Sequence, residues 1–129
     1  MVSREAIELA LKELNEAENS TELDAAGKSA VIDRLCSEGC RGWANGTSRG
    51  GRAEEREQEL ALWSTFPDYH RTFERIIIDP PHAAIQWRLT GGNPDLDMSV
   101  DVYGVSIMRF DDDARLDEFW LLFHDPLAT

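Results

Sequence analysis

The sequence predicts an α+β domain whose first half is helical and whose second half forms an antiparallel sheet. Apolar residues recur at helical spacing before residue 67, whereas later segments rich in β-branched and aromatic residues alternate with turn-forming residues. Helices that precede strands, rather than alternating with them, are typical of α+β proteins. The 129 residues suffice for one domain with its own core, which we expect to span residues 1–129.

Three helices are expected in the first half. The first begins after Ser3, a good N-cap, and is interrupted at residues 19–21. The second is expected from about residue 22 to residue 37. The third covers residues 52–66, where acidic residues crowd the first turns and Pro67 follows the end. Between the second and third helices, a glycine-rich segment is expected to form a loop that contains Trp43.

Four strands are expected in the second half, separated by short turns. The turns are marked by Asp-Pro-Pro at 79–81, Gly-Gly-Asn-Pro at 91–94 and three aspartates at 111–113. Strands joined by such short connections pair in sequence order as an antiparallel meander. The strands themselves cover residues 69–78, 83–90, 99–110 and 115–124.

The charge and hydropathy of the chain argue against two classes of partner. With 25 acidic and 13 basic residues the net charge is −12, which repels nucleic-acid phosphates and anionic lipids. No apolar run approaches the roughly 20 residues of a membrane helix. The first 20 residues contain early acidic residues and no apolar stretch typical of a signal peptide. We therefore expect a cytoplasmic protein that binds neither nucleic acid nor membrane.

The sequence indicates neither a metal site nor a cofactor. Cys36 and Cys40 would share one face of the second helix, about 5–6 Å apart at Cβ, which strains a disulfide. We interpret them as small buried residues. The three histidines come from separate segments, and the aspartates at 111–113 lack the spacing of a calcium loop.

Four short motifs in the second half resemble SnoaL-like domains. They occur in order at residues 66–68 (Phe-Pro-Asp), 87–91 (Trp-Arg-Leu-Thr-Gly), 109–110 (Arg-Phe) and 118–120 (Glu-Phe-Trp). The match covers residues 60–124 and extends to ketosteroid-isomerase-like proteins of the nuclear-transport-factor-2-like superfamily. The resemblance implies a cystatin-like curved antiparallel sheet, a half-barrel or cone, with three amino-terminal helices on its concave face and an apolar pocket between them.

The resemblance also locates positions where related isomerases and cyclases carry acids and bases. These positions fall on Ser106, near Trp43, on Leu121, and near Gly92 or Asn93. None of these side chains transfers protons well near neutral pH. The favoured interpretation is a binding domain for a small hydrophobic molecule. The alternative is a SnoaL-like enzyme, namely a polyketide cyclase, a ketosteroid-isomerase-like isomerase or an epoxide hydrolase, acting on a polycyclic or terpenoid substrate with acids such as Asp68 or Asp101.

Strand alternation and the resemblance together predict the two faces of the sheet. The pocket face is expected to have no ionisable side chain at the centre of its cavity. The opposite face, with Trp120, Leu122, Val105 and Ile107, is expected to join two copies as a homodimer. The expected pocket residues are Trp43, Trp63, Tyr69, Trp87, Ser106, Met108, Phe119, Leu121 and Phe123.

Overall fold

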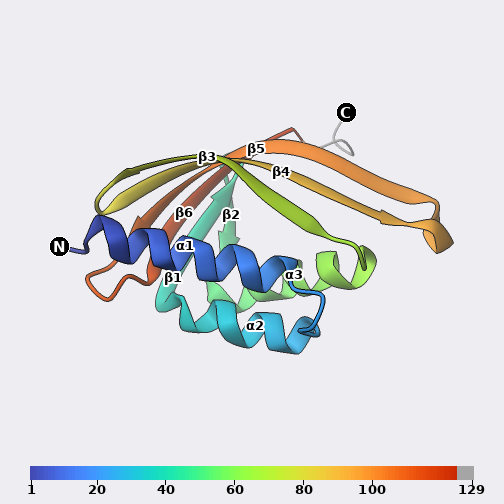
Figure 1. The fold of residues 1–129 in the computed structure, drawn as a ribbon, viewed down its shortest axis with the longest axis horizontal. Helices are drawn as coiled ribbons and strands as arrows, with labels where there is room; N and C mark the ends of the chain where they lie inside the picture. Colours follow the sequence, from blue (N-terminus) through green and yellow to red (C-terminus); the bar gives the residue numbers. More distant parts are fainter. Residues whose placement is uncertain (125–129) are drawn as a thin grey trace.

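A computed structural model describes residues 1–124, which form three helices and one six-stranded sheet (Figure 1). The predicted α+β class is confirmed, with all three helices on the concave side of the arched sheet. No helix in this part of the chain has the length and apolarity needed to cross a membrane. The elements are α1 (Arg4–Asn19), α2 (Ala25–Arg34), β1 (Cys36–Ala44), β2 (Thr47–Gly50), α3 (Arg52–Thr65), β3 (His70–Asp79), β4 (His82–Asn93), β5 (Met98–Phe110) and β6 (Leu116–Phe123), with a short 3-10 turn at Pro94–Leu96.

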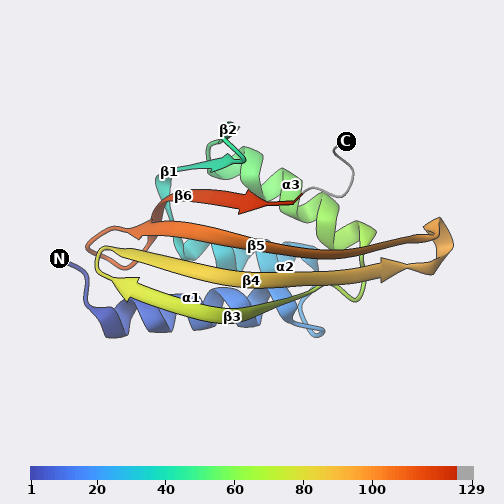
Figure 2. The same ribbon diagram turned by 90° about the horizontal axis from the view of Figure 1, so that it is seen from above.

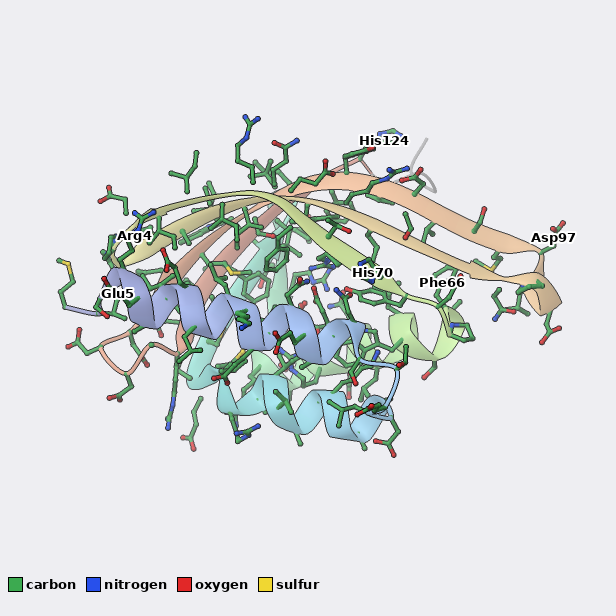
Figure 3. All side chains as sticks on the ribbon, viewed as in Figure 1. Arg4, Glu5, Phe66, His70, Asp97 and His124 are labelled. Carbon is green, nitrogen blue, oxygen red and sulfur yellow. The ribbon has the colours of Figure 1, made fainter. Side chains whose placement is uncertain are left out.

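The strands lie in the order β2-β1-β6-β5-β4-β3. Strands β3 to β6 form the predicted antiparallel meander, whereas β1 pairs in parallel with β6 and antiparallel with β2. The sheet is therefore mixed rather than wholly antiparallel. Seen from above, the β4–β5 hairpin extends beyond the helices at one end (Figure 2). Its tip, with Asp97, projects past Phe66 at the end of α3 (Figure 3).

The segment after α2 departs from the sequence-based expectation. Helix α2 ends at Arg34, and residues 36–44, expected as the end of a helix and a loop, form strand β1. The glycines that favoured a loop permit close packing instead, because a Cβ on Gly42 would lie 2.0 Å from the Phe119 ring. Cys36 and Cys40 are buried and unbridged, as expected, but they lie on this strand rather than on a helix face.

Local signals explain where the helices begin. Ser3 Oγ accepts a hydrogen bond from the backbone N–H of Ala6 at 3.1 Å, as expected for an N-cap. Asp24 caps α2 in the same way through the backbone N–H of Gly27, at 2.7 Å. These caps satisfy backbone donors that the first turn of a helix leaves unpaired. They stabilise the first turns of α1 and α2.

The inner face of the sheet carries the core. Along β5, buried side chains alternate with exposed ones, so that Ser106 and Met108 point inward and Val105 and Ile107 outward. On β4, Ile85 is fully buried. The predicted parity of these strands is confirmed, and it leaves one face of the sheet directed at the helices.

Candidate functional site

A cavity of about 780 Å³ lies between the concave face of the sheet and the helices. This volume falls within the range of roughly 300–1,000 Å³ typical of small-molecule sites. Strands β4, β5 and β6 and helices α1 and α3 all contribute to its wall, which is predominantly apolar. The large apolar side chains that border it include Phe66, Trp87, Met108, Phe119, Leu121 and Phe123.

Trp87 forms the centre of the apolar wall. Its indole lies across Gly104 of the neighbouring strand, where a Cβ would stand 2.3 Å from the ring. The indole Nε1 donates a hydrogen bond of 2.8 Å to Ser106 Oγ, and both residues are buried. The ring of Phe123 is tilted against Trp87 with centroids 6.2 Å apart. The indole is thus held in one orientation with its polar atom satisfied.

The structure brings together five of the nine expected pocket residues at the cavity wall and places the other four elsewhere. Ser106 is 1% exposed and bonded to Trp87 rather than directed into the cavity. Trp63 and Tyr69 are buried and pack edge to face, with ring centroids 6.4 Å apart. The five at the wall are Trp87, Met108, Phe119, Leu121 and Phe123.

Trp43 is the one expected pocket residue that lies on the opposite face of the sheet. The register of β1 against β6 sets it beside Trp120, and the two rings stack at 5.4 Å with an interplanar angle of 9°. The placement near Trp43 was inferred for a loop, whereas a strand fixes which way each side chain points. Trp43 therefore belongs to the outer surface.

The sequence predicts no ionisable side chain at the centre of the cavity, but several ionisable side chains border its wall. Glu18 of α1, Glu59 of α3 and Arg71 of β3 all border it. A sequence signal for Glu18 existed, because it follows Leu14 by four residues on the buried stripe of α1. Likewise Arg71 lies two residues after the buried Tyr69, which precedes β3, and this spacing places both on the inner side. Charged residues on an apolar stripe are the pattern that marks such a site.

Glu18 is almost fully buried, and its carboxylate accepts two hydrogen bonds. Its carboxylate accepts hydrogen bonds from Asn15 Nδ2 at 2.9 Å and from the Tyr69 hydroxyl at 3.3 Å. Burial raises the pKa of Glu18 above its ordinary value, and the charge of Arg71 offsets part of this effect. Lys28 donates to the backbone carbonyl of Glu18 at 2.8 Å.

Hydrogen bonds from α1 fix the backbone of Arg71. Its carbonyl accepts hydrogen bonds from Asn15 Nδ2 at 2.9 Å and Asn19 Nδ2 at 2.8 Å, and its N–H donates to Asn19 Oδ1 at 2.7 Å. The guanidinium lies over the Trp87 ring, 4.6 Å from its centroid. The carboxyl end of α1 and the indole therefore hold this cation against the cavity.

Glu59 is an acid at the cavity wall whose pKa is raised close to neutral pH. Arg56 Nη1 donates to Glu59 Oε2 at 2.8 Å. Burial nevertheless raises the pKa of Glu59 to about 8, with Glu55 and Glu18 adding to the effect and Arg56 opposing it. Such a carboxyl group holds its proton at neutral pH and can release it in mildly basic solution.

Acids considered from the sequence have structural partners elsewhere. Asp68 accepts a hydrogen bond from the backbone N–H of Gly92 at 2.7 Å. Asp101 pairs with Arg88 through two hydrogen bonds of 2.8 and 2.7 Å, and both side chains are exposed. Neither acid borders the cavity. Among residues 1–124, no cluster of three or more His, Cys, Asp or Glu side chains is arranged to hold a metal ion.

Comparison with known proteins identifies relatives by family and by fold. The family model for the SnoaL-like domain matches residues 14–118. No curated protein gives a significant match. AclR from Streptomyces galilaeus, named as a candidate hydroxylase, has a TM-score of 0.78 at 16% identity, covering 95% of this chain and 91% of its own. A candidate SnoaL-like polyketide cyclase from Jannaschia sp. CCS1 has a TM-score of 0.75 at 18% identity, covering 92% and 85%.

Two further solved structures carry the same fold under other descriptions. A candidate isomerase of the SnoaL-like family from Agrobacterium tumefaciens str. C58 has a TM-score of 0.71 at 16% identity, covering 94% of this chain and 99% of its own. An NTF2-like protein of unknown function from Exiguobacterium sp. 255-15 has a TM-score of 0.74 at 14% identity, covering 90% and 98%. At these identities the likeness establishes the shared fold, and that fold carries several chemistries.

Proposed function

Because the chain belongs to the SnoaL-like domain family, we propose that its cavity binds a small, predominantly apolar molecule. The observation that carries this proposal is the cavity of about 780 Å³ between sheet and helices, bordered by aromatic and aliphatic side chains. Removing apolar ligand surface from water against such a wall supplies the driving force, and a fixed wall lowers the cost of ordering. Trp87, held by Ser106, keeps this part of the wall in a fixed position.

Nile red, a neutral apolar dye, tests the proposal. We expect its fluorescence to rise and shift to shorter wavelength as it enters the cavity. Leu121→Trp, which fills space at the cavity wall, should weaken binding. The matched control is Ile77→Trp on an exposed position of β3, which should leave binding unchanged. A folded wild-type protein that does not bind the dye, or binds it equally well after Leu121→Trp, would count against a ligand cavity.

A second function, acid–base catalysis on a carbonyl compound, is supported by one specific observation. Glu59 borders the cavity with its pKa raised to about 8, which suits a group that exchanges protons near neutral pH. In this alternative the chain is an enzyme of the cyclase, isomerase or epoxide-hydrolase kind that acts on a polycyclic or terpenoid substrate. In this alternative Glu59 of helix α3 would transfer the proton.

Deuterium exchange next to a ketone distinguishes the two functions. The probe is 2-tetralone in D₂O, followed by proton NMR with wild type and Glu59→Gln. Catalysis predicts exchange that wild type accelerates, that increases as pH rises through about 8 and that Glu59→Gln loses. Binding without catalysis predicts the same slow exchange with both proteins.

We also propose that two copies pair through the outer face of the sheet. Val105, Ile107 and Leu122 are 38%, 40% and 54% exposed on neighbouring strands, next to the stacked Trp43 and Trp120. An exposed apolar surface of this kind is typical of an association site. A second copy of the chain would cover it.

A further inference from the structure

We propose that the molecule bound in the cavity is an apolar carboxylic acid in its ionised form, with Arg71 binding the carboxylate. This inference rests on the proposed ligand-binding function and narrows it from any apolar molecule to one with an anionic head group. Arg71 borders the cavity together with the apolar wall, so one ligand can contact both.

The guanidinium of Arg71 has donors without acceptors. Within residues 1–124, none of its N–H groups makes a hydrogen bond, and its Nε is buried without any partner. Its nearest carboxylate is Glu18, with Nη1 and Oε2 separated by 3.9 Å. That carboxylate already accepts from Asn15 and Tyr69. A cation at a cavity wall with unused donors is suited to an incoming oxyanion.

The other arginines at the cavity differ from Arg71. Arg49 donates two hydrogen bonds to Glu55, at 2.7 and 2.9 Å. Arg56 donates to Glu59 at 2.8 Å and pairs with Asp33 at 3.0 Å. Their charges are compensated by direct contacts with protein carboxylates. Among the described residues Arg71 has only the longer ion pair with Glu18, at 3.9 Å, so its N–H groups remain available to a ligand.

Contacts with the protein also restrict the position of Arg71 before a ligand arrives. Asn15 and Asn19 fix its backbone through three hydrogen bonds, and the guanidinium lies over the Trp87 ring at 4.6 Å. Stacking uses the face of a guanidinium and leaves the in-plane N–H groups free. Two of these groups match the two oxygens of a carboxylate. Because the arginine is ordered before the ligand arrives, binding costs less entropy.

The charge state of the neighbouring acids strengthens the argument. Burial raises the pKa of both Glu18 and Glu59, which favours their neutral forms beside Arg71. A ligand carboxylate would supply the negative charge that Glu59, which keeps its proton at neutral pH, withholds. The aromatic side chains farther along the wall would then contact the apolar part of the same molecule.

A matched pair of probes tests the inference. 2-Naphthoate and 2-naphthamide have nearly the same shape, and only the first is charged at neutral pH. By isothermal titration calorimetry, we expect wild type to bind the acid at least about tenfold more tightly than the amide. Arg71→Met should abolish this preference while leaving amide affinity within about twofold. Arg88→Met, which removes an arginine of the outer face, should leave both affinities unchanged.

The possible results separate this inference from the function on which it rests. Equal affinity of wild type for the two probes, or a preference that survives Arg71→Met, overturns the role of Arg71 while leaving ligand binding intact. Failure of both naphthyl probes and of Nile red overturns ligand binding itself. If Arg71→Met does not fold, Arg71→Lys replaces it. Lysine keeps the charge but lacks the paired N–H groups with which a guanidinium binds both oxygens of a carboxylate. A reduced preference for the acid therefore supports the inference, and an unchanged preference refutes it.

Discussion

Replacing Glu59 by glutamine should change how the stability of the protein depends on pH. Glutamine is nearly isosteric and still accepts a hydrogen bond from Arg56, but it has no proton to lose. The groups that face Glu59 are Arg56 and Glu55 on its own helix, Glu18 on α1 and Arg71 on β3. None of these is altered by the substitution, so the difference between the two proteins reports the ionisation of Glu59.

The magnitude follows from the displacement of the Glu59 pKa from an ordinary value of 4.5 to about 8. Over that interval the folded protein retains a proton that the unfolded chain has released. The free energy of unfolding of wild type therefore falls as pH rises from about 4.5 to about 8 and levels off above it. The full displacement corresponds to about 5 kcal/mol. Glu59→Gln should lack this decrease and become the more stable protein in basic solution.

Urea unfolding followed by tryptophan fluorescence, repeated from about pH 5 to about pH 9, measures the effect. Glu57→Gln is the matched control, because Glu57 is an exposed glutamate on the same helix, and we expect its profile to parallel that of wild type. Parallel profiles for wild type and Glu59→Gln would show that the proton affinity of Glu59 is not raised by folding. The acid–base function would then lose its support.

Three further substitutions test the packing and the assembly. Gly104→Ala should lower the free energy of unfolding by about 1–3 kcal/mol, since its Cβ would lie 2.3 Å from the Trp87 ring, and unchanged thermal unfolding would contradict that contact. Leu121→Asp should lower the free energy of unfolding by several kcal/mol, because it places an unpaired carboxylate at the apolar wall. A variant with wild-type thermal stability would mean that residue 121 faces water. Trp120→Glu should convert the proposed dimer to a monomer by light scattering, whereas a wild type that is already monomeric at micromolar concentration would refute the dimer.

The second half of the chain was predictable because its signals are local. Turn residues at 79–81 and 91–94 separate the strands, and alternation along β5 places Ser106 and Met108 on the inner face. Each of these features is determined by neighbours a few residues away. The meander could therefore be derived from local signals, whereas the choice of the inner face for Phe119 and Leu121 also needed the resemblance to SnoaL-like domains.

Strand β1 and the charged part of the site depend on distant contacts. Gly42 resembles a loop residue until the ring of Phe119, far along the chain, is known to pack on it. The parallel pairing of β1 with β6 cannot be deduced from turns, because no short connection joins them. Arg71 and Glu59 border the same cavity only because the fold brings β3 and α3 to it.

The distribution of the four tryptophans gives each face of the sheet its own optical reporter. Trp43 and Trp120 stack on the outer side, close enough for their electronic transitions to couple, so circular dichroism of this pair would respond to whatever covers that side. Trp87 is part of the cavity wall next to the Arg71 guanidinium, so a change in its fluorescence would report a bound ligand. With Trp43→Phe and Trp87→Phe as references, one sample could report association and occupancy as separate signals.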